Sequence, residues 1–347
     1  MIRLLLTLNL LFWCLVAGEA QPAKDVSTGA PHTGDKPVIP ARPYSTPEFI
    51  PFDFWHGLIR VQMTIGNLPS RPALLSTGLT DSLMSQEVAA LLKATTGVNT
   101  HVFTLERTVT AEKTQPQDVI LGQSKFSQTA FCILDLIAML SASKPGDSPD
   151  LWVGASLFSN CSLYIDTTSM QLQIQRGFVS VPRGAIVVPL EVIDGRPWVK
   201  VKINRKKTFT ALLELGTGAS LIPARIAREL KLKPGTVGPV TNADGKKGEI
   251  TQCTVSDISV GSASLKNYDI FYLSSGEKPE FDQDFAILGA DFLMQFRTTI
   301  DFKNKRLYLV RPDTPETPPS VKTSPDSHTD NAPPLSGNKP PFGNSER

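Results

Sequence analysis

Apolar and polar residues alternate at the start of two similar blocks in the middle of the chain. The alternation is clearest in "LIRVQMTI" (58–65) and "WVKVKI" (198–203), where every second residue is apolar. A period of two places the apolar residues on one face of a strand, so both segments are predicted to be half-buried β-strands. Each is followed by a turn and then by a second strand that ends in Ala-Leu-Leu.

A loop of small residues and a short helix follow each Ala-Leu-Leu. Ser82 or Ser85 is a candidate cap for the first helix, and Pro223 suits the first turn of the second. More strands with glycine turns come next, among them Asp244-Gly245, a strong hairpin signal.

Each block ends in the same way. Gly154-Ala155 or Gly289-Ala290 is followed by a short helical stretch and by a closing hairpin, "LYIDTTSMQLQI" or "TTIDFKNKRLYL". The pattern predicts a mostly β protein with one or two short helices in each half.

The two blocks form an internal repeat. Residues 73–97 align without gaps on residues 211–235, which lie 138 positions further on, and 10 of the 25 aligned positions are identical. Two later pairs of segments keep nearly the same spacing: 118–126 with 257–265, and 151–174 with 286–309. Landmarks in one order and near-constant register indicate a duplication, and they align the two halves residue by residue.

The two ends of the chain differ in composition from this repeated region. Both 21–48 and 313–347 are rich in Pro, Ser, Thr, Gly or Asn and poor in large apolar residues, so they are predicted to be a disordered linker and tail. The expected organisation is a signal peptide (1–20), the linker (21–48), a first lobe (49–180), a second lobe (181–312) and the tail (313–347).

The first 20 residues have the features of a secretory signal. Arg3 precedes an apolar run over residues 4–16, and Gly18-Glu19-Ala20 supplies small residues at positions −3 and −1 of a cleavage site. The run is too short to span a bilayer, so no membrane span is expected. We therefore expect cleavage near Ala20 and export to a periplasm or to the outside of the cell.

Composition excludes several classes of function. A formal net charge of +2 and the lack of a basic stripe argue against a nucleic-acid partner. The sequence has no P-loop, dinucleotide fingerprint or G-x-S-x-G elbow, so no cofactor is expected. The four histidines are scattered without metal-ligand spacing, so no metal site is expected either: His32, His56, His101 and His328.

Three cysteines remain after the signal, namely Cys132, Cys161 and Cys253. An odd number without a C-x-x-C motif excludes a disulfide scaffold or a zinc cluster. A Cys132–Cys161 bridge and three buried thiols are both compatible with the sequence.

The ordered landmarks together resemble the retropepsin-like aspartic proteases. In that family an inner strand leads into an Asp-Thr-Gly loop, a flap hairpin follows, and an apolar-apolar-Gly segment precedes a helix and a closing "I-D-F" strand. "FAILGADFLMQFRTTIDFKNKRLYLV" and "VTNADGKKGEI" are especially similar to it. The resemblance covers nearly all of residues 50–312, twice. It implies one chain with two β-barrel lobes related by a pseudo-two-fold axis, and a monomer where single-lobe relatives must dimerise.

The resemblance also implies a pair of catalytic aspartates, one from each loop. The gapless register places Ser76 and Glu214 at those two positions. Gly216-Thr217-Gly218 looks like the family motif, but that alignment would bury Glu214 in the apolar strand without a partner, which is costly. The loops are therefore predicted to be Ser76-Thr77-Gly78 and Glu214-Leu215-Gly216.

These replacements affect the chemistry that the resemblance implies. In the family, two carboxyls share one proton, one polarises a water and the other binds the substrate carbonyl. Ser76 cannot ionise near neutral pH, and the Glu214 side chain is one methylene longer than aspartate. In the family the threonine after the aspartate bonds to the opposite loop; Thr77 keeps that hydroxyl and Leu215 lacks it. Gly78 and Gly216 are retained.

We expect from this a catalytically degenerate pseudoprotease that binds a peptide or protein segment between its lobes or serves as a scaffold. One alternative is an active aspartic-type endopeptidase that uses a non-standard Ser76/Glu214 site. Another is new chemistry with Ser76 as nucleophile and Glu214 as base, for which the sequence offers no oxyanion hole. A purely structural exported protein is a further alternative.

Other polar and aromatic residues have both a functional and a structural interpretation. Asp81 could replace a lost aspartate or be a loop or capping residue, and His101 and Glu106 could line a cleft or be solvated hairpin residues. The structural interpretation is favoured for all of these and for the remaining candidates: the turn cations Arg205, Lys206, Lys207, Lys246 and Lys247, the closing-hairpin aspartates Asp166 and Asp301, and the core tryptophans Trp152 and Trp198.

Overall fold

The structure is a computed structural model. It describes residues 14–16, 48–104, 108–136, 149–177, 179–241, 247–274 and 286–314. Most of the predicted signal peptide, linker and tail lies outside these residues. Glu106 and the Asp244-Gly245 turn with Lys246 also lie outside them. Within them the chain is mostly β, as predicted, and folds into three sheets.

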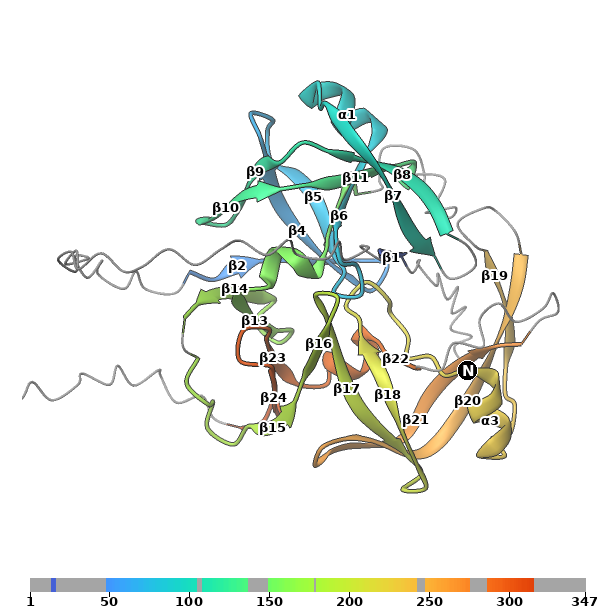
Figure 1. Cartoon of the computed structure of the whole chain (residues 1–347). Helices are drawn as coiled ribbons and strands as arrows, with labels where there is room; N and C mark the ends of the chain where they lie inside the picture. The colour runs from blue at the N-terminus through green and yellow to red at the C-terminus, as the bar shows by residue number, and fades with distance from the viewer. Residues whose placement is uncertain are drawn as a thin grey trace, which may run out of the picture. The chain divides into compact units, whose positions relative to one another are not determined.

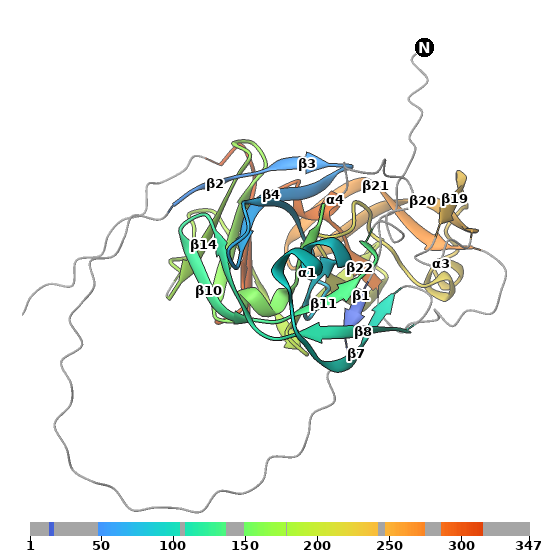
Figure 2. The same ribbon diagram turned by 90° about the horizontal axis from the view of Figure 1, so that it is seen from above.

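The first sheet comes from the first half of the chain (Figure 1). Its strands are β1 (Cys14–Val16), β3 (Asp53–Trp55), β4 (Leu58–Ile65), β5 (Arg71–Leu75), β6 (Ser82–Ser85), β7 (Thr96–Thr104), β8 (Thr108–Thr114), β9 (Gln117–Leu121), β10 (Ser124–Thr129), β11 (Phe131–Leu134) and β12 (Leu151–Val153). β7 and β8 form an antiparallel hairpin after α1, where the resemblance predicts a flap. Figure 2 shows β1 beside β7, with which it pairs antiparallel.

The second sheet comes from the second half. Its strands are β16 (Glu191–Ile193), β17 (Arg196–Ile203), β18 (Lys207–Leu213), β19 (Val237–Thr241), β20 (Lys247–Val260), β21 (Ala263–Leu273) and β22 (Ala286–Leu288). The inner strand β18 pairs parallel with β22, just as β5 pairs parallel with β12 in the first sheet. The predicted strands at 58–65 and 198–203 are present as β4 and as part of β17.

The third sheet is shared by the two halves. It contains β2 (Ile50–Pro51), β13 (Cys161–Asp166), β14 (Gln171–Arg176), β15 (Ile186–Pro189), β23 (Arg297–Asp301) and β24 (Arg306–Val310). The order is β15-β24-β23-β13-β14-β2, so each half supplies three strands and β13 meets β23 at the centre (Figure 1). The two predicted closing hairpins therefore join the halves, because a strand of one pairs with a strand of the other.

Four short helical segments complete the described fold: α1 (Gln86–Leu92), the 3-10 helix η1 (Ala155–Phe158), α3 (Ala224–Glu229) and α4 (Ala290–Leu293). Ser85 caps α1, because its hydroxyl accepts a hydrogen bond from the amide of Val88. Ser82, the alternative cap, instead accepts a bond from the amide of Gly154. No helix in the described residues is long and apolar enough to cross a membrane.

The largest of three core clusters contains apolar side chains from both halves. It runs from β4 and β5 through the shared sheet to β17 and β18. Cys132, Cys161 and Cys253 are buried free thiols, so the structure has the unpaired arrangement and not the Cys132–Cys161 bridge. Burial raises the pKa of the Cys132 thiol to about 12, which leaves it unreactive at neutral pH. The boundary between two lobes at residue 180 stays a prediction.

Candidate functional site

Two loops meet at the centre of the molecule. The first loop (residues 76–78) follows β5, and the second loop (residues 214–216) follows β18. The amide of Ser76 donates to the carbonyl of Val153 at 3.0 Å, and the amide of Glu214 donates to the carbonyl of Leu288 at 3.0 Å. Each loop thus leaves its inner strand at the same point and is fixed by the parallel strand next to it.

The side chains of Ser76 and Glu214 are in direct contact. The Ser76 hydroxyl donates a hydrogen bond to Glu214 Oε1 at 3.0 Å, although the two residues are 138 positions apart. Both are buried, with 2% and 3% of their surface exposed. The structure therefore brings together the two residues that the repeat register selected, whereas their equivalence to a catalytic dyad stays a prediction.

Backbone amides of both loops hold the Glu214 carboxyl group. The amide of Gly216 donates to Glu214 Oε1 within the second loop. The amides of Thr77 and Gly78 also donate to this carboxyl from the first loop. The longer side chain of glutamate therefore reaches across to the opposite loop and binds its backbone.

Both loop glycines are required for this packing. A Cβ atom added at Gly78 would lie 1.8 Å from Glu214 Oε2. One added at Gly216 would lie 2.6 Å from Ser76 Oγ and 2.7 Å from Glu214 Oε1. These approaches are closer than van der Waals contact, so only glycine leaves room for the buried carboxyl group.

Burial raises the pKa of Glu214 to about 7. The hydrogen bonds from Gly216, Ser76, Gly78 and Thr77 act in the opposite direction, because they favour the ionised form. Desolvation outweighs them, so the group is protonated below neutral pH.

Thr77 forms the bonds that join one loop to the other. Its hydroxyl donates to the carbonyl of Leu213 at 2.7 Å and accepts from the amide of Leu215 at 3.1 Å. Leu215 is fully buried and has no hydroxyl with which to return these bonds. The hydroxyl bonds between the loops therefore come only from Thr77, as expected from the lack of a hydroxyl at Leu215.

Gly216-Thr217-Gly218 is not arranged like the first loop. The Thr217 hydroxyl makes only local contacts, of 3.3 and 3.4 Å, with the backbone of Ala219. A Cβ atom at Gly218 would meet nothing within 4 Å, so this glycine is not required for space. The geometry agrees with the register that starts the second loop at Glu214.

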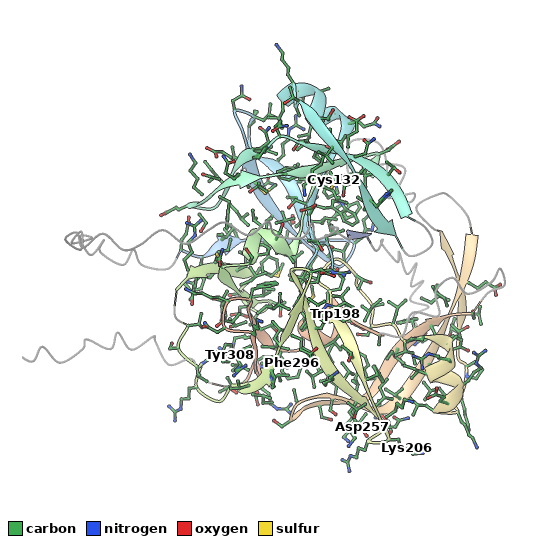
Figure 3. The ribbon with its side chains drawn as sticks, in the orientation of Figure 1. Cys132, Trp198, Lys206, Asp257, Phe296 and Tyr308 are labelled. Carbon is green, nitrogen blue, oxygen red and sulfur yellow. The ribbon has the colours of Figure 1, made fainter. Side chains whose placement is uncertain are left out.

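The sequence did not identify Arg196, which lies close to this site. Its guanidinium stacks 5.6 Å from the ring of Trp198, which is labelled in Figure 3, and is attracted by the charge of Glu214. The side chain is buried, and its Nε and Nη1 atoms have no hydrogen-bond partner. The sequence showed that Arg196 follows the Asp194-Gly195 turn, but no pattern in it indicated that the side chain would be buried.

The other candidates lie away from the two loops. Asp81 forms an ion pair with Lys113 on β8 at 2.6 Å, which is a structural role. His101 is exposed on β7, as expected for a hairpin residue. Asp166 and Asp301 each accept bonds from residues of their own hairpin turn, in agreement with the structural interpretation.

The turn cations whose side chains the structure describes, and the two tryptophans, also have structural positions. Arg205 and Lys206 are exposed between β17 and β18, and Lys206 lies near Asp257 at the tip of the second half (Figure 3). Lys207 pairs with Glu229. Trp152 and Trp198 are buried core residues. No group of three or more His, Cys, Asp or Glu residues in the described ranges is placed to hold a metal ion.

Comparison with known proteins bears on the second half. Residues 199–295 match the family model described as "gag-polyprotein putative aspartyl protease". A comparison with curated proteins found no match. The matched segment contains the second loop and extends through α4. The chain is thus similar over these residues to the retropepsin-like aspartic protease family, which confirms for this segment the resemblance that the sequence motifs predicted.

Proposed function

We propose that this chain is an exported, single-chain pseudoprotease that binds an extended peptide or protein segment and does not cleave it. In this proposal the two halves are lobes that arose by duplication, and the protein acts as a monomer. Export rests on the features of residues 1–20, and monomeric action rests on the presence of both loops in one chain.

The observation that carries the proposal is the state of Glu214. Aspartic-protease chemistry needs two carboxyls that share a proton and are free to contact water and substrate. The Glu214 carboxyl is instead bonded to Ser76 and to amides of both loops, and it is buried. A group used in this way stabilises the junction of the two loops and has no partner carboxyl at Ser76.

Peptide binding is supported by the flap strand of the first half. The outer edge of β7 already pairs antiparallel with a short extended segment, β1, from Cys14 to Val16. This segment belongs to the predicted signal peptide, which export would remove. The edge of β7 would then offer unpaired backbone groups to an extended peptide, a common mode of peptide recognition.

An active endopeptidase with a Ser76/Glu214 site is the second candidate. The favourable observation is a hydroxyl that donates at 3.0 Å to a carboxyl whose pKa is about 7, near the value that suits a general base. Against it, the amides of Thr77 and Gly78, which follow Ser76 in the first loop and could stabilise an oxyanion, already bind Glu214 itself.

A binding and cleavage experiment on one preparation separates these candidates. The chain is incubated with fluorogenic extended peptides between pH 3 and pH 8, beside the Glu214→Gln variant, and binding is followed by fluorescence anisotropy. We expect binding without turnover in both proteins. Turnover that Glu214→Gln removes would support the endopeptidase, and absence of binding would leave the structural alternative.

A further inference from the structure

Arg196 is a buried cation with unused hydrogen-bond donors. More than nine-tenths of its side chain is removed from solvent. Two of its three guanidinium nitrogens, Nε and Nη1, have no partner. Burial lowers the pKa of the guanidinium, but arginine remains charged in proteins, so the site carries a positive charge with free N–H groups.

The neighbours of Arg196 fix its position without neutralising it. Trp198 offers a ring face 5.6 Å from the guanidinium. Asp194 Oδ2 lies 3.5 Å from Nη2, but the Asp194 side chain is 59% exposed, so this pair is weak. Glu214 attracts the guanidinium at longer range, while its own carboxyl is occupied by Ser76 and the loop amides.

The hairpin that carries Arg196 lies against the first loop region. Arg196 opens β17 directly after the Asp194-Gly195 turn. The Thr80 hydroxyl, two residues after the first loop, donates to the carbonyl of Asp194 at 2.9 Å. Arg196 is thus presented from the second half at the place where the two loops meet.

The residue of the first half that matches Arg196 is apolar. In the matching hairpin of β3 and β4, Leu58 pairs with Trp55 across the turn, as Arg196 pairs with Ile193 in β16 and β17. Leu58 is a fully buried apolar residue. A hairpin of this shape therefore folds with leucine, and leaving charged donors unpaired at Arg196 is unfavourable for folding.

We propose that Arg196 binds a carboxylate of the peptide that occupies the site, with Nε and Nη1 as donors and Trp198 as the supporting ring. Arginine recognises carboxylates through just such charge-assisted bonds, and burial strengthens them. This inference rests on the proposed peptide-binding function. The carboxylate comes from an acidic side chain of the peptide or from its C-terminus.

Blocked octapeptides distinguish the two sources of the carboxylate. One glutamate is moved through each position of an otherwise neutral peptide that is acetylated and amidated, and the matched control carries glutamine. A second pair compares a free C-terminus with an amidated one. Binding to the full chain is measured by calorimetry. We expect one glutamate position, or the free C-terminus, to bind at least tenfold more tightly than its neutral control.

Two variants test whether this preference belongs to Arg196. Arg196→Leu places the residue of the matching hairpin at this position, and we expect it to remove the tenfold preference, so that each carboxylate peptide and its neutral control bind with equal affinity. Arg196→Lys keeps the charge without the planar group, so part of the preference should remain.

Thermal unfolding of the free protein gives a second, independent result. Because Arg196→Leu removes an unpaired buried charge, we expect the Tm to stay equal to or rise above that of the wild type. A lower Tm with unchanged carboxylate preference would assign Arg196 to structure and overturn the proposal.

The binding experiments distinguish loss of the carboxylate site alone from loss of the whole peptide-binding function. If glutamate and glutamine peptides bind equally and Arg196→Leu changes nothing, the peptide-binding function stands and the carboxylate site falls. If none of the peptides binds, both fall together.

Discussion

The first and second loops occupy matching places in their sheets but differ in the side chains that they contribute. The first loop provides two hydroxyls, and Thr77 uses its hydroxyl to hold the backbone of the second loop. The second loop provides a carboxyl and an apolar side chain, and Glu214 holds the backbone of the first loop. Each loop therefore binds the other, but through a different residue.

The two loops therefore remain hydrogen-bonded to each other although they carry different side chains. Leu215 cannot return the bonds that Thr77 makes, and the amide of Thr77 is bonded instead by the carboxyl of Glu214. The extra methylene of glutamate makes that reach possible. We infer that Glu214 acts as a structural connector between the two loops.

Gly78→Ala should have the largest effect on stability. The new Cβ would lie 1.8 Å from Glu214 Oε2, so the carboxyl must leave its amides, at a cost of about 3–5 kcal/mol. Gly218→Ala is the matched control, because nothing lies within 4 Å of its Cβ, and it should change stability by less than about 1 kcal/mol. Urea unfolding measures both. Equal effects would contradict the predicted register.

The stability of the folded protein should depend on the ionisation of Glu214. Its folded pKa of about 7 exceeds the ordinary value of 4.5, so protonation favours the folded state. This contribution is fully present below pH 4.5 and is lost as pH rises through 7, a change of about 3 kcal/mol. Glu214→Gln should remove that part of the pH dependence in unfolding curves at pH 4.5 and 7. Parallel curves for the two proteins would show that Glu214 titrates normally.

Thr77→Val should weaken the junction from the first loop. The substitution keeps the shape but leaves the carbonyl of Leu213 and the amide of Leu215 unpaired, which costs about 2–3 kcal/mol. Thr217→Val is the control, because the Thr217 hydroxyl makes only long local contacts, and it should cost less than about 1 kcal/mol. Equal losses of unfolding free energy in the two variants would show that the Thr77 hydroxyl does not stabilise the contact between the loops.

Leu215→Thr should have the smallest effect of the four. A hydroxyl at this position can bond to the first loop as Thr77 bonds to the second, which offsets part of the lost apolar contact and leaves a cost of about 1–2 kcal/mol. Leu213→Thr, also fully buried, has no such compensation and should cost about 3 kcal/mol. The opposite order in chemical denaturation would mean that the second loop cannot form the missing bonds.

Local patterns predicted much of this fold. The alternation of apolar and polar residues located β4 and most of β17. Ser85 was one of two candidate caps for α1. The repeat register selected Ser76 and Glu214, which are in contact. These features depend on residues close in sequence or on a direct comparison of the two halves.

Features that depend on the spatial arrangement of both halves were not predicted. The pairing of β13 with β23 joins strands far apart in sequence, and no local pattern specifies it. The reach of Glu214 to the amides of Thr77 and Gly78 depends on the distance between the loops. The burial of the Arg196 side chain could not be predicted, because the alternation of apolar and polar residues next to a tight turn does not fix which face of the sheet a residue occupies.

Peptide cleavage by the wild type beside the double variant Ser76→Asp, Glu214→Asp shows whether the buried Ser76–Glu214 pair is catalytic. Both proteins are assayed at acid pH with and without a transition-state-mimic inhibitor of aspartic proteases. We expect no inhibitor-sensitive turnover by the wild type, and turnover by the double variant, which has an aspartate at each of the two positions. Inhibitor-sensitive cleavage by the wild type that Glu214→Gln abolishes would contradict this expectation.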